Sequence, residues 1–187
     1  YRNFPPDVTF EDDLYKWDKL TDKELARGPI CQWMPVQSLI TSPPPNAILG
    51  GKLDKVKVRG VSWSGNGAGM ARVDVSLDGG KNFTSADFLP KPKKVEEREV
   101  WQRKWSWYLF EAEIPIPEAQ KQAIAEGKPV QFDLTSKGVD NQFNVQPSDV
   151  LAYYNPRGVV VNNFYHVPIT VDPKKPKGSI DRDTSDN

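Results

Sequence analysis

Prolines and glycines interrupt this chain so often that they favour short strands and turns over long helices. The 187 residues include 17 prolines and 13 glycines, which set turn geometry and weaken the interior of regular elements. Between these breaks, apolar and polar residues alternate with the period of a half-buried strand. In 72–77, for example, Val73, Val75 and Leu77 are predicted to point inward. This pattern predicts an all-β fold.

Several other segments predict strands. They are 33–40, 55–63, 105–114, 130–134 and 164–171. Asp78-Gly79-Gly80 predicts a hairpin whose return strand opens at Phe83. Gly60 suggests a bulge within its strand. Pro168, which has no backbone N–H to donate, suggests that the last strand lies at a sheet edge, or that the position of the missing N–H faces away from the neighbouring strand.

Two short helices are expected outside these strands. One falls within the charged segment 11–27, where Thr21 and Glu24 fit a capping box. The other is 117–126, which has Pro117 at its start and Gly127 just past its end. The second helix would bridge two strands.

The strand at 105–114 is apolar on both faces. One face carries Trp105, Trp107 and Leu109, and the other carries Tyr108, Phe110, Ala112 and Ile114. A strand of this kind is either central or has one face in an interface.

About seven strands with little helix predict an immunoglobulin-like β-sandwich. We expect an N-terminal arm over 1–30, the sandwich over 31–172 and a flexible, disordered tail over 173–187, which has almost no core-forming residues.

Charge and cysteine content exclude several function classes. Lys plus Arg number 25 and Asp plus Glu number 25, so the basic surplus typical of nucleic-acid or anionic-membrane binding is missing. A single cysteine, Cys31, and a single histidine, His166, cannot form a structural zinc cluster within the chain. We expect no nucleic-acid partner, no membrane partner and no metal ligands here.

The segment from Asn144 to Val161 places one cation, Arg157, before an apolar run. An arginine in apolar surroundings needs an anionic partner. Its planar guanidinium suits a carboxylate or a small oxyanion. From the residues alone, an ion pair within the protein is favoured over a ligand site.

Several segments, taken in order, resemble the C-terminal dimerisation domain of the sulfite oxidase family of molybdenum oxidoreductases. They are Met34-Pro-Val-Gln-Ser38, Val58-Arg-Gly-Val-Ser-Trp-Ser-Gly65, Arg72-Val-Asp-Val-Ser-Leu-Asp-Gly-Gly80, Trp105-Ser-Trp107, Val139-Asp140 with Asn144-Val-Gln-Pro147, and Asn155-Pro-Arg-Gly158. The resemblance covers about residues 1–171 and implies an immunoglobulin-like sandwich, which we expect to be of the E-set type.

The resemblance also implies a site. A preceding domain, outside this chain, holds the molybdenum–molybdopterin cofactor, so this domain alone is expected to be inactive. Arg157 would bind sulfite or sulfate, and Tyr1 would supply a catalytic hydroxyl near the metal. Cys31 does not match the metal ligand, and His166 is interpreted as structural. Partners would be a second copy, the cofactor domain, and cytochrome c or a haem domain; the compartment would be the mitochondrial intermembrane space or the periplasm.

One departure from the family pattern bears on the substrate. The family usually has Trp-Asn-Leu-Arg-Gly where this chain has Tyr154-Asn-Pro-Arg-Gly158, and Pro156 could change the aim of Arg157. Two alternatives to a sulfite oxidase remain: the same domain of a molybdenum nitrate reductase, whose members typically lack this arginine, and a free-standing immunoglobulin-like binding module.

Overall fold

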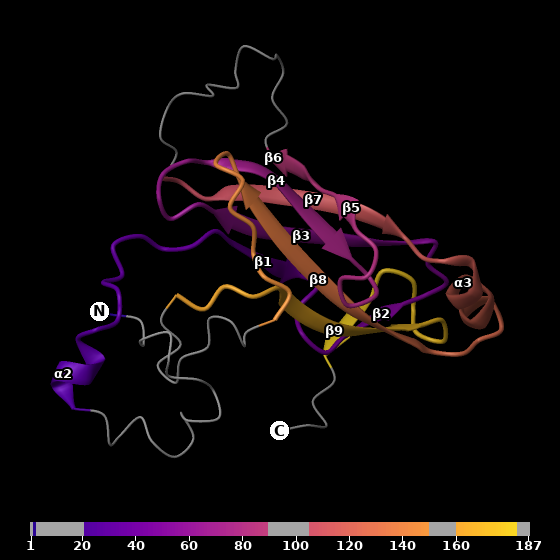
Figure 1. Ribbon diagram of the computed structural model, residues 1–187. Coiled ribbons are helices and arrows are strands. Elements are labelled where there is room, and N and C mark those ends of the chain that lie inside the picture. The colour runs from indigo at the N-terminus through magenta and orange to yellow at the C-terminus, as the bar shows by residue number, and fades with distance from the viewer. Residues whose placement is uncertain (1, 3–20, 90–104, 150–159, 183–187) are drawn as a thin grey trace, which may run out of the picture.

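The computed structural model describes residues 2, 21–89, 105–149 and 160–182. Within these ranges, two β-sheets pack face to face (Figure 1). The first sheet has the order β1-β3-β7-β6, and the second has the order β10-β2-β9-β8-β4-β5. The predicted all-β sandwich is confirmed.

The first sheet is antiparallel throughout. Its strands are β1 (Gln37–Ser42), β3 (Lys55–Trp63), β6 (Asp87–Leu89) and β7 (Tyr108–Pro115). Strand β7 lies between β3 and β6. The alternative of a central strand is therefore confirmed for 108–115. Its outward face is apolar only at its start, at the half-exposed Leu109, and continues with Glu111 and Glu113.

The second sheet contains one parallel pair, β2 with β9. Its strands are β2 (Ala47–Gly50), β4 (Met70–Ser76), β5 (Thr84–Ser85), β8 (Val130–Asp140), β9 (Tyr165–Asp172) and β10 (Ile180–Arg182). The return strand after the Asp78 hairpin divides between the two sheets. Its first part, β5, pairs with β4, and its second part, β6, pairs with β7.

The core lies between the sheets and is made by the inward positions of the alternating strands. Val56, Val58 and Phe110 contribute from the first sheet and are at most 1% exposed. Val73 and Leu134, from the second sheet, are fully buried. Burial of these side chains is the main source of stability, at about 25 cal/mol for each Å² of apolar surface.

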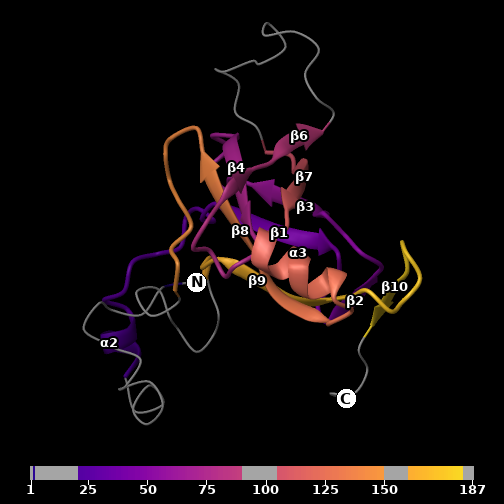
Figure 2. The ribbon, with the colours of Figure 1, turned by 90° about the vertical axis from the view of Figure 1, so that its right-hand side faces the viewer.

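Two helices occur in the described ranges, at opposite ends of the molecule (Figure 1). The first, α2 (Asp22–Leu25), begins with the predicted capping box: Glu24 N donates to Thr21 Oγ1 over 3.3 Å, and Thr21 N donates to Glu24 Oε2 over 2.8 Å. The second, α3 (Glu118–Ala125), lies against the end of the sandwich near β8 and β9 (Figure 2). Neither is long and apolar enough to cross a membrane.

Three sequence expectations are corrected. Of the two alternatives for Pro168, the edge position is wrong, because β9 is internal, between β2 and β8. The carbonyl of Pro168 accepts from Asn46 N where the pairing with β2 begins. The bulge lies in β1 at Thr41, opposite Gly60, and β3 itself pairs with β7 without a shift.

The third correction concerns the C-terminal tail. Residues 180–182 form β10, which pairs with β2, and Gly50 N donates to Ser179 O over 2.9 Å. The expected disorder is therefore wrong for 173–182, and residues 183–187 lie outside the described ranges.

Candidate functional site

The two site residues predicted from the sequence, Tyr1 and Arg157, both lie outside the described residues. Their neighbours in the chain are described. Arg2 forms a bridge with Ile30, and its guanidinium Nη1 donates to Gly28 O over 2.8 Å. On the other side, Pro147 and Val160 flank the segment that contains Arg157.

These flanking residues border one pocket of about 840 Å³. Ile30 belongs to its wall, and so do Pro147 and Val160. The pocket is therefore bordered by the bridge partner of Arg2 and by described residues on both sides of 150–159. The rest of the wall comes from 31–36, the turn after β8, Asn66 and Asn162.

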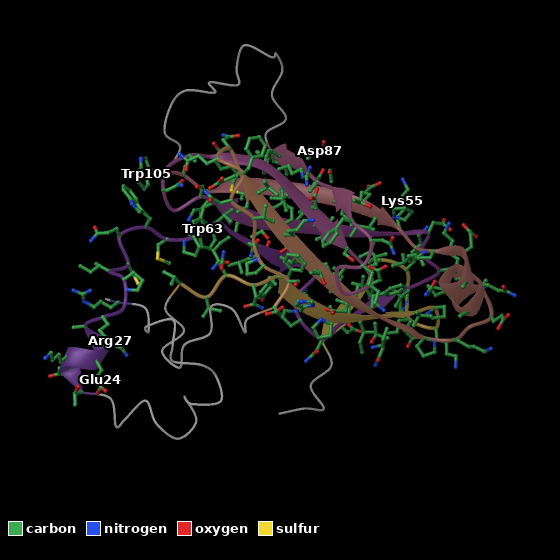
Figure 3. All side chains as sticks on the ribbon, in the orientation of Figure 1. Glu24, Arg27, Lys55, Trp63, Asp87 and Trp105 are labelled. Atoms are coloured by element: carbon green, nitrogen blue, oxygen red, sulfur yellow. The ribbon has the colours of Figure 1, made fainter. Side chains whose placement is uncertain are left out.

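Aromatic side chains lie at this end of the sandwich. Trp33 and Trp105 stack with ring centroids 6.3 Å apart, and Trp63 and Trp107 stack at 5.7 Å. Trp33 is 58% exposed and belongs to the pocket wall. Figure 3 shows Trp63 and Trp105 at one end of the first sheet, with Lys55 at the other. Exposed aromatic surface next to a pocket favours a contact with another protein surface.

The turn after β8 is held by one buried carboxylate, Asp140, which is 1% exposed. Its Oδ1 accepts from Gln142 N and Asn144 N, each over 2.9 Å. Its Oδ2 accepts from Asn144 Nδ2 over 2.8 Å and from Ser64 Oγ over 3.1 Å. With four donors around it, this carboxylate is satisfied by the protein and fixes the wall of the pocket.

Gln146 is a buried polar residue in this turn whose burial the sequence did not reveal. It is 2% exposed, whereas Val145 beside it is 50% exposed, which reverses the usual order of polar and apolar residues. The only signal was the Asn144–Pro147 segment of the family pattern, which assigned it no role.

No described cluster suits a metal ion. Across the described ranges, no three His, Cys, Asp or Glu side chains lie close enough to bind one. Cys31 is half-buried at the pocket wall. His166, on the outward phase of β9, has its Nδ1 2.8 Å from Asp133 Oδ2 and 3.2 Å from Thr135 Oγ1.

Comparison with known proteins identifies relatives over most of the chain. Residues 29–172 match the family model described as "Mo-co oxidoreductase dimerisation domain". "Sulfite oxidase, mitochondrial" of Homo sapiens is 33% identical over 174 residues, which are 92% of this chain and 27% of the relative. "Sulfite oxidase" of Arabidopsis thaliana is 34% identical over 168 residues, 89% of this chain and 37% of the relative.

A weaker similarity links the chain to a different enzyme. "Nitrate reductase [NADPH]" of Fusarium oxysporum is 28% identical over 126 residues, 60% of this chain and 13% of the relative. The chain spans only about a quarter to a little over a third of the length of the curated sulfite oxidases it matches. Because the family model matches residues 29–172, which contain every strand except β10, this chain belongs to the Mo-co oxidoreductase dimerisation domain family.

Proposed function

We propose that this chain is the dimerisation domain of a molybdenum-dependent sulfite oxidase, which oxidises sulfite to sulfate. The observation that carries this proposal is the breadth of the similarity. Enzymes named sulfite oxidase match about nine-tenths of the chain at 30–34% identity, whereas the nitrate reductase matches 60% at 28%. The activity belongs to the longer protein, since the chain is about a quarter of such a relative.

In this proposal, Arg157 binds the substrate. Sulfite is a small oxyanion, and a guanidinium can hold two of its oxygens by charge-assisted hydrogen bonds. The position of Pro147 and Val160 on the pocket wall supports this role, because they flank the segment of Arg157.

Tyr1 is the proposed catalytic hydroxyl, which holds a proton near the reacting oxyanion. The bridge between Arg2 and Ile30 supports it, because Ile30 borders the same pocket. Conversion of sulfite to sulfate takes an oxygen atom from water and releases two protons and two electrons. The molybdenum–molybdopterin cofactor of a separate domain supplies the two-electron chemistry, and cytochrome c or a haem domain takes the electrons. The isolated domain is therefore proposed to be inactive.

The chain is further proposed to form an isologous homodimer through the outer face of the first sheet. One end of that face is apolar, with Trp107 and Leu109 more than half exposed. The other end is an ion-paired row: Lys55 lies 3.4 Å from Glu113, and Lys57 and Arg59 each lie 3.1 Å from Glu111. An apolar area bordered by paired charges is typical of a protein interface.

We propose that residues 1–30 connect the sandwich, 31–172, to the cofactor domain. The proposed compartment is the mitochondrial intermembrane space, supported by relatives named as mitochondrial; the alternative is the periplasm. Two alternative functions remain: a dimerisation domain of a molybdenum nitrate reductase, which the Fusarium relative favours, and a free-standing binding module.

The test uses the intact native protein. Its mass, its molybdenum content, and its reduction of cytochrome c with sulfite or of nitrate with a reduced donor should be measured side by side. The proposal predicts a mass well above that of this chain, about one molybdenum per chain and turnover of sulfite. Turnover of nitrate alone would favour the nitrate reductase, and a metal-free protein without turnover would leave a binding module.

A further inference from the structure

The outer face of the first sheet carries opposite charges on its two middle strands. The outward positions of β3 hold Lys55, Lys57 and Arg59, which we call the basic row. The outward positions of β7 hold Glu111 and Glu113, which we call the acidic row. The strand register matches the rows residue by residue, since Lys57 lies opposite Glu113 and Arg59 lies opposite Glu111.

The same face becomes apolar towards the other end of these strands. Val61 lies opposite Leu109, and beyond them the rings of Trp63 and Trp107 stack with centroids 5.7 Å apart. The edge strands β1 and β6 extend this region, because each places a leucine at the level of Val61 and Leu109. We call the whole set the apolar band: Leu39, Val61, Trp63, Leu89, Trp107 and Leu109.

Two copies that meet through this face in an aligned packing have two possible symmetry axes. Sheets packed in this way keep their strands within about 30° of each other, so a two-fold axis in the contact plane runs either along the strands or across them. An axis along the strands, between β3 and β7, places β3 of one copy over β7 of the other and keeps every residue at its own level. An axis across the strands places β3 over β3 and reverses the levels.

We infer that the occupant of this face is a second copy of the chain, related by a two-fold axis that runs along the strands between β3 and β7. This inference rests on the proposed homodimer and adds the direction of its axis and the residues that meet. The basic row of each copy then faces the acidic row of the other, so that Arg59 of one copy meets Glu111 of the other. An axis across the strands would instead set the basic row against itself, and like charges at an interface oppose association.

The two parts of the face contribute differently. The apolar band supplies affinity, because buried aromatic side chains dominate the binding energy of interfaces. The charged rows fix the orientation, since charge pairs across an interface give specificity more than affinity. Within one copy, Lys57 and Arg59 already pair with Glu111. The approach of a second copy therefore joins existing ion pairs into a network and leaves no charge of these rows unpaired.

The test exchanges the two rows in the intact protein, so that each ion pair within a copy is kept with its charges reversed. The swapped variant carries Lys55→Glu, Lys57→Glu, Arg59→Glu, Glu111→Lys and Glu113→Lys. Tagged wild type and the swapped variant are co-expressed, and native mass spectrometry counts the wild-type, variant and mixed dimers. The matched control is Lys175→Glu with Asp181→Lys, which reverses an ion pair of 2.6 Å on the other sheet.

The expected result is that each protein pairs with its own kind. A mixed dimer would set the acidic row of the wild type against a row made acidic in the variant, and repulsion of this kind selects against the wrong partner. Mixed dimers should fall from about half of all dimers, the random proportion, to below about a tenth. The control variant should mix with the wild type at random.

Three results overturn the inference. Mixed dimers above the random proportion would show that the axis runs across the strands, because the variant's rows would then face rows of opposite charge. Random mixing of the swapped variant would show that this face is not the contact. A monomeric wild type overturns the proposed homodimer as well, whereas turnover of sulfite by the same sample reports separately on the proposed oxidase function.

A second measurement does not depend on the folding of the swapped variant. Lys55→Cys and Val61→Cys are made separately and treated with a thiol cross-linker of about 10–12 Å, close to the distance between packed sheets. An axis along the strands keeps each position near its own copy, so both variants should cross-link into dimers. The two positions lie about 20 Å apart along β3, so an axis across the strands brings at most one of them close to its copy. Wild type, with Cys31, is the control, and failure of either variant to exceed it overturns the inference.

Discussion

Gly60 lies directly over the ring of Phe110, its cross-strand partner on β7. A Cβ atom at residue 60 would come within 2.2 Å of Phe110 Cζ and within 2.3 Å of the main-chain oxygen of Leu39. No side chain fits there without displacing both a buried ring and the backbone of β1.

Gly60→Ala should therefore destabilise the fold by about 1–3 kcal/mol, the usual cost of overpacking a core. Urea unfolding of the variant and the wild type measures this difference. The matched comparison is Gly178→Ala, where φ is +83° and no atom lies within 4 Å of the added Cβ. That change adds only backbone strain, of about 1 kcal/mol. An equal or smaller loss at Gly60 would contradict the steric explanation.

The carboxylate of Asp78, in the hairpin, should make the free energy of unfolding depend on pH in the acidic range. Desolvation alone would raise its pKa, but hydrogen bonds from the Ser76 hydroxyl, from Asn82 and from Lys81 N lower the pKa of Asp78 from 3.8 to about 2. Because the folded pKa lies below the ordinary value, the ionised group stabilises the fold above about pH 4. That contribution is lost as the pH falls from 4 towards 2.

Asp78→Asn should remove this pH dependence. Since the carboxylate is largely exposed to water, we expect a contribution of about 1 kcal/mol. The free energy of unfolding should be measured at neutral pH and near pH 2.5 for both proteins. The wild type should lose more stability on acidification than the variant by about that amount, and identical losses would count against the role of Asp78.

Leu109→Arg should weaken the proposed homodimer. Leu109 is 51% exposed on β7, beside Trp107, and a charge placed at an apolar interface is costly to bury. Sedimentation of the intact protein should show a dimer dissociation constant raised about tenfold or more. The control is Ile180→Arg, which is similarly exposed at 56% but lies on β10 of the other sheet. Equal effects of the two changes would argue against this face.

Alternation along single strands made much of the fold predictable. The inward residues of β3 and β7 follow a period of two, and so do Val73 and Val75 in β4, so these core positions could be read from sequence. Asp74 and Ser76 point away from that core, as predicted, but both are buried. Neighbouring side chains shield Asp74 from water: its Oδ2 lies 2.9 Å from Arg72 Nε on the same strand and 3.6 Å from Lys137 Nζ on the neighbouring strand.

The wrong predictions share one physical cause. Strand position depends on pairing with residues far away in the sequence, whereas the predictions used local residue types alone. Pro168 predicted either an edge strand or an outward missing donor, and the edge alternative failed because β9 is internal, with its pairing to β2 beginning one residue later, at Ile169. The tail is polar, yet 180–182 add a strand beside β2.

The site was predictable only in outline. Arg157 and Tyr1 were predicted from family motifs and stay predictions. The burial of Gln146 could not be predicted, because nothing in the local sequence indicates that Gln146 is buried while its neighbour Val145 is exposed. Its hydrogen-bond partners include Ser38 and Asn162, which are 108 and 16 residues away in the sequence.

The most direct test of the central claim is the KM for sulfite of the intact enzyme with Arg157→Gln, compared with Arg72→Gln, whose side chain is exposed and paired with Asp74 on the second sheet. If Arg157 binds the oxyanion, its loss should raise KM by about a hundredfold or more and weaken inhibition by sulfate to a similar extent, since charge-assisted hydrogen bonds are lost. Arg72→Gln should leave both values near those of the wild type. An Arg157→Gln enzyme with an unchanged KM and unchanged sulfate inhibition would contradict the account.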